Sequence, residues 1–137
     1  LSLGHSQASE AQAKEAFDQG FRGVTHCWNA LAFHHRSPGV LGAALGRKEL
    51  FVELIVDLIH VSPTVIRWTR ALHEQESIYF VSDCLAAGGN ASPLATEKVD
   101  AIRTADGRLA GGKLLLTQAY SRWATQEALD QKKELQS

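Results

Sequence analysis

The sequence predicts an α/β protein built from parallel β/α units, and three observations carry that prediction. Short apolar segments typical of strands alternate with amphipathic segments typical of helices. Residues 51–59 are almost continuously apolar, as expected of a strand covered on both faces of a parallel sheet. Polar side chains directly follow the predicted strands. Four strands are half of a (β/α)8 TIM-type barrel, which takes about 250 residues, so we predict a partial barrel of about four β/α units.

The first two predicted strands flank a helix with signals at both ends. Residues 1–3 form a short apolar strand, and Ser9 followed by Gln12 is a capping box that opens a helix. Gly20 ends that helix, because glycine readily takes the left-handed conformation after a last helical turn. Residues 23–26 are the second predicted strand.

The middle of the chain continues the alternation. A small helix is expected over residues 40–45, before the apolar strand described above. Ser62 and Pro63 supply an N-cap and a first helical residue, which predicts a helix through about His73. Residues 78–81 form the fourth predicted strand.

The C-terminal part is predicted to contain a small hairpin and a last helix. Residues 99–104, with the turn residues Asp106 and Gly107, favour a β-hairpin. Apolar residues at helical spacing predict a final helix from about Leu115. The chain reads as a single barrel segment over residues 1–137, with a polar tail that is expected to fray from about residue 127.

Composition and charge exclude several classes of protein. A formal net charge of -1 with scattered basic residues gives no electrostatic case for nucleic acid. No apolar stretch approaches the roughly 20 residues that cross a bilayer, so we expect no membrane partner and a cytoplasmic location. Cys27 and Cys84 form no metal-type pair and are expected to be buried free thiols.

Four polar residues fall at equivalent places. His5, His26, His60 and Asp83 each stand at the C-terminal end of a predicted strand, and in a parallel barrel these ends open on one face. Two imidazoles suit a divalent ion such as zinc, and a nearby carboxylate can move protons. Taken singly, a histidine here is more often bonded to the backbone, and Asp83 could cap a turn. The repeated position favours the functional interpretation.

Six short segments resemble, in order and spacing, successive signatures of the N-acetylglucosamine-6-phosphate deacetylase family of amidohydrolases. They are LGHS from Leu3, THCWNA from Thr25, FHHRSPG from Phe33, DLIH from Asp57, SDC from Ser82 and GRLAG from Gly107. The resemblance covers about the first 120 residues and implies the C-terminal half of the family's catalytic barrel.

The resemblance implies a metal-dependent hydrolysis. His5 and His26 match metal-binding histidines, and Asp83 matches the aspartate that acts first as general base and then as general acid. The implied cofactor is a divalent metal ion, with zinc favoured and iron, manganese and cobalt as alternatives. The implied reaction releases acetate and glucosamine 6-phosphate from N-acetylglucosamine 6-phosphate.

The resemblance also implies a binding site for a phosphorylated amino sugar. Asn29 and the backbone at Ala30 match a phosphosugar-binding turn, and Arg36 matches an arginine that pairs with phosphate. His60 matches a histidine that contacts the substrate, where it could orient the acetamide carbonyl. Leu109, Ala110 and Gly111 match a loop that closes over the sugar.

Two departures from the family pattern bear on activity. Leu58 stands where the family usually has glycine. The family's metal-ligating glutamate belongs to an earlier strand, and the chain, which starts at Leu1 and contains no methionine, has no glutamate in that motif. We therefore expect a fragment that is inactive alone and that pairs with the missing N-terminal half or forms a homo-oligomer.

Two other functions stay open at this stage. Another amidohydrolase that opens a cyclic amide would use a similar metal site, although the Asn-Ala turn and the His-His-Arg loop favour a phosphosugar. A non-catalytic half-barrel could instead act as a binding or assembly module, because unpaired strands at its open edges would drive association.

Overall fold

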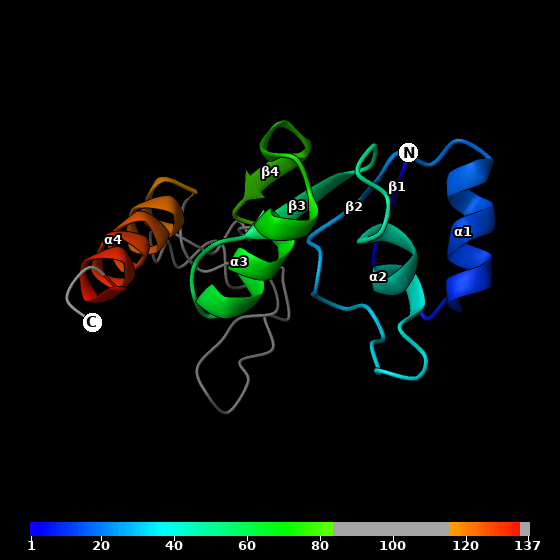
Figure 1. Ribbon diagram of the computed structural model, residues 1–137. Helices are drawn as coiled ribbons and strands as arrows, with labels where there is room; N and C mark the ends of the chain where they lie inside the picture. Colours follow the sequence, from blue (N-terminus) through cyan, green and yellow to red (C-terminus); the bar gives the residue numbers. More distant parts are fainter. Residues whose placement is uncertain (84–115, 135–137) are drawn as a thin grey trace, which may run out of the picture. The chain divides into compact units, whose positions relative to one another are not determined.

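The computed structural model describes residues 1–83 and 116–134 of the chain (Figure 1). The elements, in chain order, are β1 (Ser2–Leu3), α1 (Glu10–Asp18), β2 (Gly23–Val24), α2 (Gly39–Ala44), β3 (Phe51–Ile55), α3 (Pro63–Leu72), a 3-10 turn (Gln75–Ser77), β4 (Ile78–Val81) and α4 (Leu116–Glu134). The predicted hairpin, the Leu109–Gly111 loop and Cys84 lie outside the described residues.

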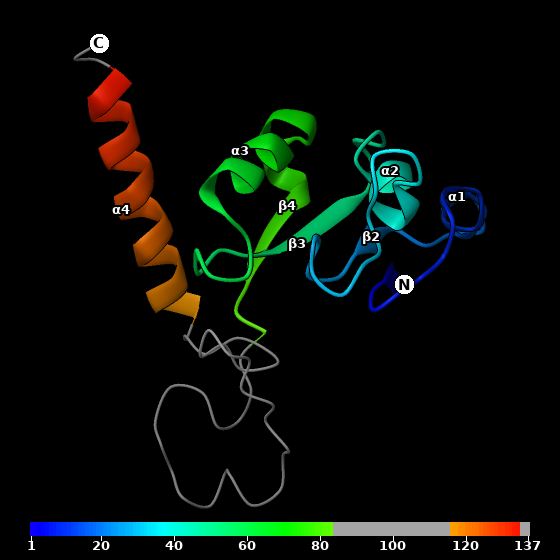
Figure 2. The same cartoon turned by 90° about the horizontal axis from the view of Figure 1, so that it is seen from below.

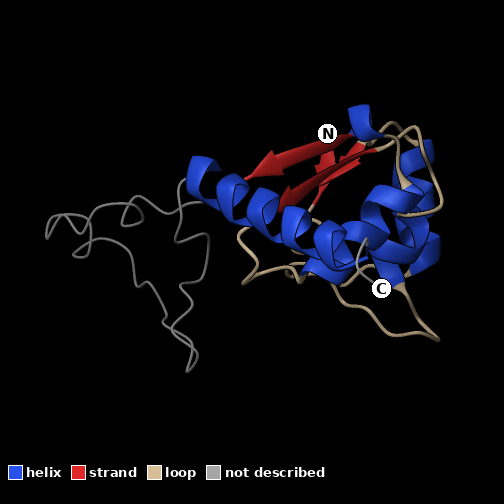
Figure 3. Cartoon of the chain, turned by 60° about the vertical axis from the view of Figure 1, so that its left-hand side comes forward, coloured by secondary structure: helices blue, strands red, loops and turns tan. Residues whose placement is uncertain are grey.

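The strands form one sheet in the order β1-β2-β3-β4. Pairing is parallel between β1 and β2 and between β2 and β3. Figure 3 draws the strands of the sheet as red arrows. Ser2 lies opposite Gly23, which in turn lies opposite Phe51. A Cβ atom added to Gly23 would come within 2.4 Å of the Phe51 ring, so only glycine fits under that ring. The predicted α/β class with a parallel sheet is confirmed.

The chain divides into two compact units, which are described separately. The first comprises Leu1–Leu54 and Thr64–Tyr79, and the second comprises Ile55–Pro63 and Phe80–Ser137. None of the described helices is long and apolar enough to span a membrane.

Helix α1 confirms the predicted capping box. The Ser9 hydroxyl accepts the Gln12 backbone N–H at 3.3 Å, and the Gln12 side chain accepts the Ser9 backbone N–H at 2.9 Å. Gly20 follows the helix with φ 108°, as its predicted role requires. Figure 2 shows α2 beside α1, and the buried face of α1 presents Ala13 and Phe17.

Strand β3 is shorter than predicted. It ends at Ile55, so the prediction of a strand through residue 59 is wrong for its last four residues. The Asp57 carboxylate accepts the backbone N–H groups of Ile59 and His60, both at 2.9 Å, and so turns the chain out of the sheet. Val56 and Asp57 remain buried although they are not in a strand, which is why the apolar pattern runs on past Ile55.

The other predicted elements lie close to where they were expected. Pro63 is the first residue of α3, and β4 spans the four predicted residues. In the second unit, rings of Phe80, Tyr120 and Trp123 lie 5.2–6.0 Å apart between centroids and anchor α4. Helix α4 continues to Glu134, through most of the segment in which we expected fraying. Lys132 and Lys133 in its last turn favour that extension, because cations stabilise the negative end of the helix dipole.

Candidate active site

Predicted site residues at three strand ends share an uncommon backbone conformation. His5 follows β1, His26 lies two residues beyond β2, and Asp83 lies two residues beyond β4. Their φ angles are 46°, 33° and 47°, in the left-handed region that side chains other than glycine rarely adopt. At each of these positions the chain has therefore left the extended strand conformation. Backbone conformations of this kind concentrate at functional sites.

The structure brings His5 and His26 together. Their ring centroids lie 4.7 Å apart with the rings edge to face, because β1 and β2 are adjacent and parallel. His26 is buried, and its Nδ1 lies 3.1 Å from the Asn29 carbonyl oxygen, which can only accept a hydrogen bond. Nδ1 therefore carries the proton, and the Nε2 lone pair of His26 is left for a metal ion. His5 is exposed beside it.

A shallow pocket joins His5 to the predicted phosphosugar turn. It has a volume of about 390 Å³ and is lined by His5, Gln7, Ala30, Leu31 and Ala32. Within the described part of the chain, the buried side-chain nitrogen of Asn29 has no hydrogen-bond partner. A buried amide N–H without a partner is costly, and a polar ligand would satisfy it. Sequence reasoning missed Gln7, whose only signal is its place two residues after His5.

Arg36 projects from a tight turn. His34 and Ser37 exchange two backbone hydrogen bonds of 3.3 and 2.8 Å, and the Arg36 backbone N–H donates to His34 Nδ1 at 3.3 Å. The His35 ring lies against the His34 ring, with centroids 4.0 Å apart. The whole turn is exposed, so the Arg36 guanidinium is presented to solvent.

Trp28 attaches the predicted phosphosugar turn to helix α3. Its indole Nε1–H donates to Thr69 Oγ1 at 2.8 Å, and the Thr69 hydroxyl donates to the Val65 carbonyl at 2.9 Å. The Phe33 ring packs on Trp28 edge to face, at 5.8 Å between centroids. These contacts hold the segment that carries Asn29.

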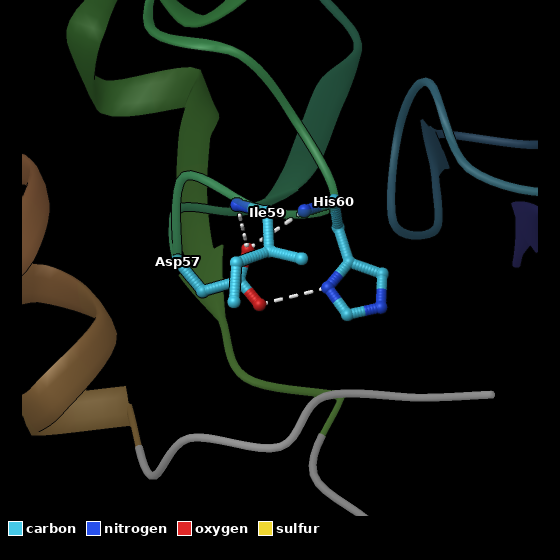
Figure 4. A network of polar contacts seen from close by, with 3 residues as sticks. All are labelled: Asp57, Ile59 and His60. Atoms are coloured by element: carbon cyan, nitrogen blue, oxygen red, sulfur yellow. Dashed lines mark hydrogen bonds and ion pairs between the residues drawn. The ribbon is translucent and has the colours of Figure 1, made fainter. Parts of the chain in front are cut away.

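In the second unit, His60 pairs with a buried aspartate. His60 Nδ1 lies 2.7 Å from Asp57 Oδ2, and the Asp57 side chain is 1% exposed (Figure 4). Sequence reasoning assigned Asp57 no role of its own. Asp83 lies in the same unit, and its side chain is exposed.

The described residues do not by themselves form a complete metal-binding group. Across residues 1–83 and 116–134, no group of three or more histidine, cysteine, aspartate or glutamate side chains could hold a metal ion. His5 and His26 fit as two ligands of one ion, since their rings adjoin and the tautomer of His26 is fixed. Cys27 is fully buried, and burial raises the pKa of its thiol to about 12. It is the buried free thiol that was predicted.

Comparison with curated proteins finds sugar-phosphate deacetylases. No family model matches the chain. The chain is 38% identical over 120 residues to the N-acetylgalactosamine-6-phosphate deacetylase of Escherichia coli O157:H7, covering 82% of this chain and 32% of the relative. It is 48% identical over 65 residues to the N-acetylglucosamine-6-phosphate deacetylase of Vibrio furnissii, covering 47% of this chain and 16% of the relative.

Comparison with solved structures agrees. The N-acetylglucosamine-6-phosphate deacetylase of Thermotoga maritima matches with a TM-score of 0.75 and 30% identity, over 91% of this chain and 37% of that chain. A mutant of the Mycobacterium smegmatis enzyme, in complex with N-acetyl-D-glucosamine-6-phosphate, matches with a TM-score of 0.72 and 27% identity, over 87% and 34%.

The parallel β/α order and these likenesses define the class of protein as an amidohydrolase. Within that class, the chain belongs to the N-acetylglucosamine-6-phosphate deacetylase family. It spans 32% and 16% of the length of the two curated relatives described above.

Proposed function

We propose that this chain is the segment of a metal-dependent N-acetylglucosamine-6-phosphate deacetylase that supplies two metal ligands, the acid/base and the phosphosugar contacts. The supporting observations are the contact between the His5 and His26 rings and the pocket that His5 shares with Ala30 of the proposed phosphosugar turn. In the complete cytoplasmic enzyme, the β/α units would form the C-terminal half of a (β/α)8 barrel.

The proposed metal site combines residues of this chain with one ligand from outside it. His5 and His26 would bind the ion, which we propose to be zinc, with iron, manganese or cobalt as alternatives. The glutamate of the family motif would complete the site. Held by these residues, a divalent ion would supply Lewis-acid activation of water near neutral pH. Asp83 takes the proton of the attacking water and then delivers a proton to the leaving amine.

The proposed substrate contacts come from three side chains and one loop. The Asn29 amide N–H, buried and unsatisfied among the described residues, donates to the sugar phosphate. The exposed Arg36 guanidinium can hold phosphate oxygens through two parallel hydrogen bonds. His60 orients the acetamide carbonyl, and Leu109, Ala110 and Gly111 close over the sugar.

One observation favours a second substrate. The relative with the longest of the two curated alignments described above is an N-acetylgalactosamine-6-phosphate deacetylase. The two amino sugars differ in the configuration of one hydroxyl group and share the acetamide and the phosphate. Both should therefore be assayed.

The test is acetate release from each phosphosugar by the complete protein that contains this segment. Asp83→Asn should lower kcat by about 10²- to 10⁴-fold, the usual contribution of general acid–base catalysis, while metal content is retained. His26→Ala should lose metal and activity together. Asp18→Asn, which neutralises an exposed carboxylate that pairs with Arg47 in the first unit, is the matched control and should keep both.

Three outcomes would reject the proposal. Full activity without metal would exclude the metal mechanism. Hydrolysis of a cyclic amide without deacetylation would favour another amidohydrolase. A stable homodimer with neither metal nor hydrolytic activity would favour the assembly module.

A further inference from the structure

Asp57 is a buried carboxylate that makes three polar contacts within one turn. Its Oδ1 accepts the backbone N–H groups of Ile59 and His60, each at 2.9 Å, and its Oδ2 lies 2.7 Å from His60 Nδ1. The Asp57 side chain is 1% exposed, and the His60 side chain is 13% exposed. A buried charge is retained only when it is paired and hydrogen-bonded, and these three contacts meet that requirement.

The pairing decides which ring nitrogen of His60 carries a proton. An ionised carboxylate can only accept hydrogen bonds, so the contact at 2.7 Å requires a proton on Nδ1. A neutral imidazole has one N–H, which leaves Nε2 as an acceptor. Figure 4 shows that this second ring nitrogen points away from Asp57.

We propose that Asp57 is a positioning residue, which fixes the tautomer and the rotation of His60 so that His60 meets its ligand through Nε2. The claim about ligand contact rests on the proposed function, whereas the claim about the tautomer does not. Asp57 itself does not contact the substrate.

The same carboxylate also positions the His60 backbone. By accepting two consecutive backbone N–H groups, Oδ1 holds the turn that ends the apolar segment after β3. The His60 side chain is therefore fixed at both its backbone and its ring. Such double restraint orients a functional group to within the narrow limits that catalysis demands.

The arrangement suits the role proposed for His60 toward an acetamide oxygen. A ring that donates to that oxygen through Nε2 carries protons on both nitrogens, with Nδ1–H still on Asp57. Asp57 then provides the opposite charge at 2.7 Å. Donors aimed in advance at a developing negative charge stabilise it strongly.

The direct test is the tautomer of His60, read from long-range ¹H–¹⁵N NMR couplings of the ¹⁵N-histidine-labelled folded chain near neutral pH. We expect the neutral ring to carry its proton on Nδ1. Asp57→Asn should reverse this, since the amide oxygen can still accept the two backbone N–H groups while the amide N–H donates to Nδ1. The proton must then move to Nε2.

Asp18→Asn is the matched control. It neutralises an exposed carboxylate that pairs with Arg47 in the first unit, and it should leave the His60 signals unchanged. A proton on Nε2 in the unaltered chain would overturn the proposal, and this measurement needs no variant to fold. An unchanged tautomer in folded Asp57→Asn would overturn it as well.

The second test is kinetic and uses the complete protein. Asp57→Asn should lower kcat by about 10- to 100-fold, the range for groups that orient another functional side chain, with a smaller change in KM. Loss of binding with kcat retained would show a merely structural role. If the protein hydrolyses neither phosphosugar while the tautomer is as expected, the proposed function fails and the positioning of His60 stands.

Discussion

At the scale of single residues, the site is marked by backbone conformation. Among the described residues, six that are not glycine have a positive φ, and four of these, His5, His26, Ala30 and Asp83, are predicted site residues. The left-handed conformation costs an ordinary residue about 1–2 kcal/mol. The fold must compensate that cost elsewhere, as expected where geometry serves function.

Leu58 also has a positive φ, of 63°, and follows Asp57 in the turn that leads to His60. In the middle of a regular helix or strand, glycine makes the protein less stable than alanine does, by about 0.5–1 kcal/mol. At a position with positive φ, alanine is strained and glycine is not. We therefore expect Leu58→Gly to be more stable than Leu58→Ala by about 1 kcal/mol, measured by urea unfolding. Both variants lose the same side-chain contacts, so their difference isolates the backbone. The opposite order would show that this turn is not strained.

At the scale of elements, the adjacent strands β1 and β2 bring His5 and His26 together, and the segment after β2 holds His26 in place. The turn after β2 is attached to α3 by a side chain 41 residues away in sequence, through the Trp28–Thr69 hydrogen bond. The same turn fixes the His26 tautomer through the Asn29 carbonyl. The order of this loop therefore depends on a helix that forms later in the chain.

Trp28→Phe keeps an aromatic ring but removes the indole donor to Thr69, which is fully buried. We expect a loss of about 1 kcal/mol in the free energy of unfolding, the net value of one hydrogen bond. Trp68→Phe is the matched control, because Trp68 lies beside Thr69 on α3 and is 58% exposed. This substitution should lower the free energy of unfolding by less than about 0.5 kcal/mol. Chemical denaturation followed by circular dichroism compares them, and equal costs would contradict the anchoring role.

At the scale of the whole molecule, pH dependence of stability has an identifiable source. His73 follows α3, where its backbone N–H donates to the Thr69 carbonyl at 3.0 Å. Neither ring nitrogen makes a hydrogen bond within the described part of the chain. Burial lowers the pKa of His73 below its ordinary value of 6.5, and the Leu50 backbone and the charge of Glu49 offset part of this effect.

The sign of the effect follows from that direction. Below about pH 6.5 the unfolded chain binds a proton at His73 that the folded chain does not bind, so the unfolding free energy falls as the pH is lowered toward the folded pKa. Above that pH the contribution is constant. The slope from one group is at most about 1.4 kcal/mol per pH unit.

His73→Leu should flatten this dependence below about pH 6.5, as measured by urea unfolding at several pH values. His35→Gln, at an exposed histidine, should leave the slope unchanged. If stability rises as the pH falls, or if His73→Leu keeps the full slope, His73 is not the group responsible.

Local signals in the sequence were sufficient for most of the elements. The capping box at Ser9 and Gln12, the helix start at Pro63 and the apolar segment of β4 each depend on residues within a few positions of one another. The alternation of strands and helices then determines the parallel α/β class, because parallel strands need a crossover between them. These features follow from the sequence alone, since the interactions behind them are local.

Only the tertiary structure decided the contacts of the site. The His5–His26 ring contact depends on the register of β1 and β2, and the place of Gln7 in a pocket depends on a loop more than 20 residues away. Even the Asp57–His60 pair, three residues apart, was hidden from sequence reasoning. Residues at that spacing point to opposite faces of a strand, so they can meet only because β3 ends at Ile55. The pattern of apolar residues reports burial, but where a buried segment stops being a strand depends on which backbone groups find partners in the fold.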